Sequence, residues 1–128
     1  MNNLDKNSVI GVAAMLVHAA NIDEKYSDKE KTLIKEFIQS YLKDDNVEEI
    51  LKKAEEIEKN SNQLLNYTNI IKKNSIEIKS EIIEHLWKII ISDNAIDMFE
   101  SNLMRRICGL IYFPDKLCGE IKLRLLKN

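Results

Sequence analysis

One arrangement of residues occurs twice in the chain and constrains its fold more than any other feature. In the stretch Ile90–Arg106, an apolar segment ends near Asp93, a short polar turn follows, and a second helical pattern begins. The stretch Ala20–Lys35 repeats this layout around Asp23. Because hydrophobic residues recur at helical spacing on both sides of each turn, the repeat predicts a duplicated helix–turn–helix.

The signature of a helix N-terminus follows each of the two turns. Ser27 with Glu30, and Asp97 with Glu100, have the spacing of a capping box. In such a box the first side chain accepts from an amide of the first turn, and the glutamate accepts from the N-cap amide. The two pairs therefore predict helices that begin at Ser27 and Asp97.

The composition favours an all-α protein with a single domain over residues 1–128. The chain has 128 residues, 45% of them hydrophobic and 31% charged, which is typical of one globular domain. Gly (3) and Pro (1) are scarce. Strand-rich folds need many turns built from these residues, so the composition argues against them.

Periodicity predicts about seven helices, arranged as duplicated halves around two central apolar helices. The expected ranges are 8–22, 27–43, 47–59, 63–73, 76–92, 97–111 and a last helix after Pro114. The first is apolar on nearly all sides, which is typical of a buried central helix, and 76–92 is its counterpart. Ser8 is the expected N-cap of the first helix, and Asp115 that of the last.

Four acidic residues of the two turns form the main candidate for a binding site, namely Asp23, Glu30, Asp93 and Glu100. Carboxylate oxygens are ligands suited to Ca²⁺ or Mg²⁺. If the halves pack about a pseudo-twofold axis, the four side chains can share one cation. Structural roles also account for all of them, because the glutamates complete capping boxes and the aspartates can accept from turn amides. The spacing is not that of an EF-hand loop.

Charge and hydropathy bound the partners and the compartment. The net charge is −2 and no continuous Lys/Arg face is present, which argues against nucleic-acid binding. No apolar stretch is long enough to span a membrane. The apolar run Val9–Val17 follows Asp5 and Lys6, so it lacks the positive flank of a signal peptide. We therefore expect a cytoplasmic protein.

Cysteines and histidines give no recognised catalytic or metal-binding pattern. Cys108 and Cys118 do not form a CxxC pair, and each falls on the apolar side of a helix, so we expect reduced core residues. His18 and His85 belong to no histidine motif. The expectation is therefore no enzyme. A small enzyme would require an inter-helix pocket holding His18 or His85 with an acid.

Two stretches resemble the tellurite-resistance TerB-like family, in its stand-alone bacterial branch. The first is LVHAANID-x-x-Y-S-x-x-E in Leu16–Glu30, and the second is HLWKIIISDNAID-x-x-E-x-x-L-M-R-R-I-C-G-L in His85–Leu110. The resemblance implies an all-α fold with duplicated halves, each with an Asp-Gly turn followed by a Glu, positions suggested to bind metal. Glu24 and Asn94 stand where that family has the glycines. A left-handed turn is less accessible to Glu than to Asn, so the first turn is expected to differ in shape.

The resulting functional expectation is a non-enzymatic interaction or scaffold module linked to stress or tellurite resistance. It would act through protein partners or as a homodimer, and an exposed apolar patch is its expected mark. Met98–Phe99 and Tyr112–Phe113 are the candidates for that patch. The alternatives are a divalent-cation-binding protein that uses the acidic turns, and a small enzyme with an inter-helix pocket.

Overall fold

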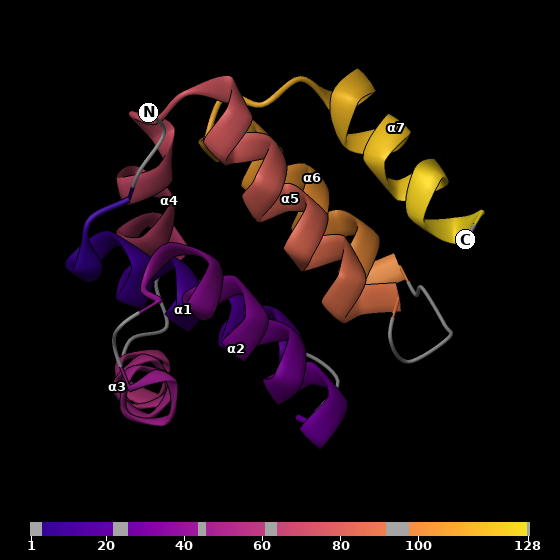
Figure 1. Ribbon diagram of the computed structural model, residues 1–128. Helices are drawn as coiled ribbons and strands as arrows, with labels where there is room; N and C mark the ends of the chain where they lie inside the picture. The colour runs from indigo at the N-terminus through magenta and orange to yellow at the C-terminus, as the bar shows by residue number, and fades with distance from the viewer. Residues whose placement is uncertain (1–3, 22–25, 44–45, 61–63, 92–97, 128) are drawn as a thin grey trace.

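The computed structural model describes residues 4–21, 26–43, 46–60, 64–91 and 98–127, and within them it contains seven helices and no strand (Figure 1). The helices are α1 (Lys6–Ala20), α2 (Asp28–Tyr41), α3 (Val47–Asn60), α4 (Leu64–Lys72), α5 (Ile76–Ile91), α6 (Met98–Leu110) and α7 (Asp115–Leu126). The predicted all-α class is confirmed.

Helix α1 is the centre of the fold. Every residue from Val9 to Val17 is buried, and α1 packs against α2, α3, α4 and α5. Small residues allow this close packing. A Cβ atom on Gly11 would lie 2.5 Å from Cδ1 of Ile70, so α4 occupies the space that a larger side chain would need. The expectation of a buried central helix is confirmed.

Helix α5 is the second apolar helix, and it links the two sides of the molecule. It packs against α1 and α2 on one side and against α7 on the other (Figure 1). Its buried side chains include Ile82, Ile83, Leu86 and Trp87. Helix α6 packs against α4 and α7. The equivalence of the two halves remains a prediction, because the second turn lies outside the described residues.

Two predicted helix caps are wrong, although the helix ranges agree with the expected ones to within about two residues. Asp5, not Ser8, is the N-cap of α1, and its carboxylate accepts from the Ser8 amide at 2.7 Å. This hydrogen bond lowers the pKa of Asp5. Asp and Ser are comparable N-caps, so the sequence alone did not decide between them. Pro114 precedes α7, and Asp115 is the first helical residue.

The turn between α6 and α7 has the hydrogen bonds of a Schellman motif. The Phe113 amide donates to the Cys108 carbonyl at 2.8 Å, and the Tyr112 amide donates to the Gly109 carbonyl at 3.4 Å. Tyr112 has a φ of 60°, the left-handed conformation that this motif requires and that glycine usually provides. The Tyr112 side chain is 72% exposed, whereas Phe113 is buried. The turn therefore places a non-glycine residue in a strained conformation.

This strain predicts that Tyr112→Gly is more stable than Tyr112→Ala by about 1 kcal/mol. Both variants remove the ring, which lies 5.6 Å from Nζ of Lys72, so their difference isolates the backbone term. Urea unfolding followed by circular dichroism measures both free energies of unfolding. Equal stability of the two variants would contradict a left-handed Tyr112.

Candidate functional site

The segment between α1 and α2 ends in a complete capping box. The Ser27 amide donates to Oε1 of Glu30 at 2.7 Å, and the Glu30 amide donates to Oγ of Ser27 at 3.2 Å. The Glu30 side chain is only 2% exposed. The first predicted capping box is thus confirmed, and Glu30 uses one carboxylate oxygen to begin α2.

Two glutamates of helix α3 accept hydrogen bonds from residues on both sides of this segment. The hydroxyl of Tyr26 donates to Oε2 of Glu55 at 2.7 Å, and the side-chain amide of Asn21 donates to Oε1 of Glu58 at 2.9 Å. Nζ of Lys31 lies 5.0 Å from the centre of the Tyr26 ring. The α1–α2 connection is therefore fixed to α3 on both sides of residues 22–25.

The Tyr26 phenol lies near several carboxylates at the connection between α1 and α2. Burial raises the pKa of the Tyr26 phenol well above its ordinary value, and so does its hydrogen bond to Glu55. The charges of Glu55, Glu30 and Glu58 raise it further. Three carboxylates therefore act on one phenol. The sequence does not reveal these contacts, because nothing local marks a partner in another helix.

The described residues leave the predicted four-carboxylate site untested. Asp23 and Asp93 lie outside them. Glu100 belongs to α6, but its side chain also lies outside the described residues. Among the residues that the structure does describe, no three histidine, cysteine, aspartate or glutamate side chains are placed to hold a metal ion. Of the four, only Glu30 has a described role, and that role is the helix cap.

A hollow of about 560 Å³ opens between α1, α3 and α4. Its walls are mainly aliphatic and aromatic, with charged side chains of α3 at the edge. Ile57 is 40% exposed there, and in the described part of the chain Ile76, Tyr112, Leu123 and Leu126 are also large hydrophobic residues that are exposed. The lining residues are Asn7, Ile10, Gly11, Lys53, Glu56, Ile57, Tyr67 and Ile70. We call this hollow the α1–α3–α4 groove.

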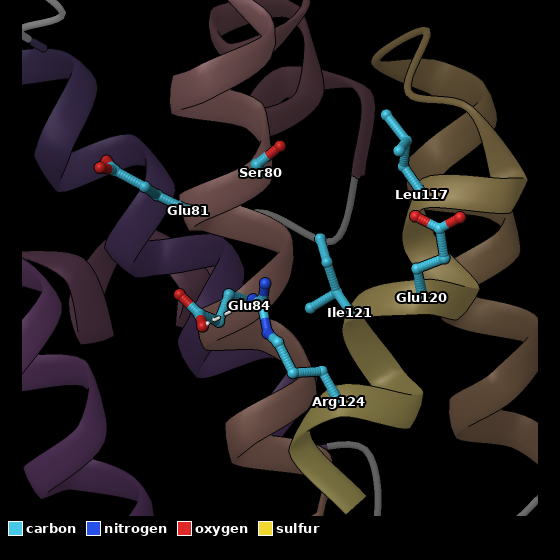
Figure 2. A pocket seen from close by; sticks show the side chains of 7 residues that line it. All are labelled: Ser80, Glu81, Glu84, Leu117, Glu120, Ile121 and Arg124. Atoms are coloured by element: carbon cyan, nitrogen blue, oxygen red, sulfur yellow. Dashed lines mark hydrogen bonds and ion pairs between the residues drawn. The ribbon is translucent and has the colours of Figure 1, made fainter.

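A second hollow, of about 430 Å³, lies between α5 and α7, and one ion pair crosses it (Figure 2). Nη2 of Arg124 lies 2.9 Å from Oε1 of Glu84, across one end of the hollow. Figure 2 shows Glu81 pointing away from α7, and its carboxylate accepts from the Tyr41 hydroxyl. Leu117 and Ile121 supply the apolar wall on the α7 side.

Neither histidine lines these hollows. His85 packs edge-on against Phe37, with ring centres 5.2 Å apart, and its Nδ1 lies 3.0 Å from the carbonyl oxygen of Glu81. His18 is half-buried in the last turn of α1. The small-enzyme alternative therefore gains no histidine–acid pair in either hollow. No helix in the described part of the chain has the length and apolar character needed to cross a membrane.

The family model described as "Tellurite resistance protein TerB" matches residues 9–123. The chain belongs to the TerB family. The match covers nearly the whole chain and confirms the resemblance seen in the two turn stretches. No curated protein and no solved structure gives a significant match to this TerB-family chain.

The Tyr26–Glu55 contact predicts a stability change that depends on pH. Removing the hydroxyl in Tyr26→Phe leaves the Glu55 carboxylate without its donor, so we expect a loss of about 1 kcal/mol at neutral pH. Because the folded-state pKa of Tyr26 is raised, its contribution is complete below pH 10 and decreases above it, where the unfolded chain ionises first. Denaturant unfolding at increasing pH above 10 should show the free energies of unfolding of the native protein and of Tyr26→Phe converging. A difference that stays constant would contradict the assignment.

Proposed function

We propose that this TerB-family protein is a cytoplasmic, non-enzymatic interaction module that serves in a stress response, and that it binds a partner protein in the α1–α3–α4 groove. The name of the family, tellurite resistance protein TerB, supports the link to tellurite stress. The groove itself carries the binding proposal, because it combines an apolar floor with charged side chains at its edge.

The floor and edge of the groove define the chemistry of the partner. Ile57 and Ile70 present aliphatic surface, and Lys53 and Glu56 place one charge of each sign beside it. Protein interfaces commonly have this arrangement of a buried apolar centre and a polar rim. The matching occupant is a segment of another protein with an aliphatic anchor between an acidic and a basic residue. The Lys53 and Glu56 side chains then set its orientation by complementary charge.

Site-specific photo-crosslinking tests this assignment. A photoreactive residue at Lys53 should crosslink one partner protein in living cells, whereas the same residue at Lys116, exposed on α7, should not. With that partner purified, Ile57→Glu should weaken the complex about tenfold or more, because it places a charge on the apolar floor. Glu77→Gln, at an exposed position of α5, is the control and should leave the affinity unchanged.

Several outcomes of the crosslinking experiment are informative. A crosslink to a second copy of the chain would identify a homodimer that uses the groove. The same products from both positions, or a complex insensitive to Ile57→Glu, would contradict the groove as the binding surface.

A genetic experiment tests the link to tellurite stress. Deletion of the gene should increase the sensitivity of the cells to tellurite, and unchanged sensitivity would contradict the link to that stress.

The acidic turns support a second candidate function, the binding of Ca²⁺ or Mg²⁺ through Asp23, Glu30, Asp93 and Glu100. The supporting observation is that Glu55 and Glu58 add carboxylates beside the first turn. A nearby cluster of negative charge favours a divalent cation. The capping bond of Glu30 competes with this role, since it occupies one oxygen.

Calorimetry with Ca²⁺ and Mg²⁺ distinguishes the two roles of the acidic residues. Cation binding predicts heat in the native protein that is lost in Asp23→Asn with Asp93→Asn and retained in Glu77→Gln. Structural capping predicts no binding heat in any of the three and a lower free energy of unfolding for the double variant. The second result would contradict the cation-binding function.

A further inference from the structure

Cys108 and Cys118 meet across the interface of α6 and α7. Their side chains lie close enough for each thiol to shift the pKa of the other, and neither cysteine is in a disulfide. The Schellman turn that ends α6 reverses the chain and brings α7 back against it, which positions the pair. Cys108 has no exposed surface, and Cys118 is 6% exposed. The two sulfurs therefore form an ordered dithiol with one inner and one outer member.

Cys118, the outer member of the pair, lines a hollow of about 450 Å³. Residues of α5, α6 and α7 form its walls, so we expect a small molecule to reach Cys118 from this hollow. The other lining residues are Trp87, Met104, Arg105, Asp115, Gly119 and Lys122. Arg105 and Lys122 bring two positive charges to the lining of the hollow, and Asp115 brings one negative charge.

The neighbours of Cys118 favour its thiolate. Its sulfur accepts from Nε1 of Trp87 at 3.3 Å, and the Cys108 thiol lies beside it. Lys122 lies one turn further along α7, with its Nζ held 5.3 Å from the centre of the Trp87 ring. The interaction with Cys108 is the largest of these effects, and together they lower the pKa of Cys118 to about 7 despite its burial and the negative charge of Asp115. The same contact and burial raise the pKa of Cys108.

We propose that Cys118 is a site of reversible oxidation by hydroperoxides and that Cys108 resolves it as an intramolecular disulfide. The Cys118 thiolate attacks one peroxide oxygen, the O–O bond breaks, and the departing oxygen leaves as water or an alcohol after protonation. Cys118 is then a sulfenic acid. Cys108 attacks the Cys118 sulfur, the S–O bond breaks, and the hydroxide leaves as water with the thiol proton.

The balance of the two steps is that of dithiol oxidation. Two thiols lose two electrons and two protons, and one peroxide is reduced. A thiol reductant reverses the product by exchange. The disulfide would join α6 to α7 directly, provided that the two sulfurs close to about 2.05 Å. This site is separate from the α1–α3–α4 groove, so the oxidation proposal does not depend on the proposed function.

Peptide mass spectrometry after exposure of the reduced protein to hydrogen peroxide tests the assignment. We expect a disulfide between Cys108 and Cys118 in the native protein, removed by dithiothreitol. Cys108→Ser should instead accumulate a Cys118 sulfenic acid that dimedone traps, and Cys118→Ser should leave Cys108 unmodified. If either serine variant fails to fold, the presence or absence of the Cys108–Cys118 disulfide in the native protein still decides the test.

A pair of surface variants tests the role of the hollow. Lys122→Met should slow oxidation of Cys118 roughly two- to fivefold, because it removes positive charge beside the thiolate. Lys116→Met, on the same helix but outside the hollow, is the matched control and should have no effect. Two results would overturn the proposal. In the first, hydrogen peroxide oxidises added glutathione while both thiols of the protein can still be alkylated. In the second, the disulfide forms only between two chains.

Discussion

The structure depends above all on the burial of α1, a helix with apolar residues on every side. Such a helix exposes hydrophobic surface wherever a neighbour is missing, so it requires cover from several directions. Helices α2, α3, α4 and α5 provide that cover. The two surfaces that we connect with binding lie at the edges of this packing. One is the acidic connection between α1 and α2, and the other is the α1–α3–α4 groove.

Helix α3 gives these two surfaces a common support. It supplies Glu55 and Glu58 to the α1–α2 connection, and Ile57 with Lys53 to the groove. Its inward residues Ile50, Leu51 and Ala54 are buried in the core. A change that moves α3 would therefore alter both surfaces together.

The other side of the molecule is organised differently. Helix α5 carries Trp87, whose indole N–H reaches Cys118 on α7, and α7 is returned to α6 by the Schellman turn at Tyr112. The dithiol thus lies at a junction of three helices, distant in the chain from the acidic turn of the first half. Oxidation would join α6 to α7 by a covalent bond. Helices α1 and α3, which line the groove, are not part of that pair.

The features that followed from the sequence are those with local causes. The helix ranges follow from apolar periodicity, and the box of Ser27 and Glu30 follows from a spacing of three residues. The contacts Tyr26–Glu55 and Trp87–Cys118 join different helices, so no local pattern reveals them. The left-handed Tyr112 was missed because the usual glycine signal is absent there.

Native-state hydrogen exchange measures the central claim most directly. If the cover of α1 holds the fold together, the amides of residues 12–17 should exchange slowest, with the free energy of global unfolding, and residues of α7 should exchange through smaller openings. The result that would contradict this account is exchange of α1 amides at a lower free energy than those of α5 and α7, since α1 would then not be the element on which the rest is built.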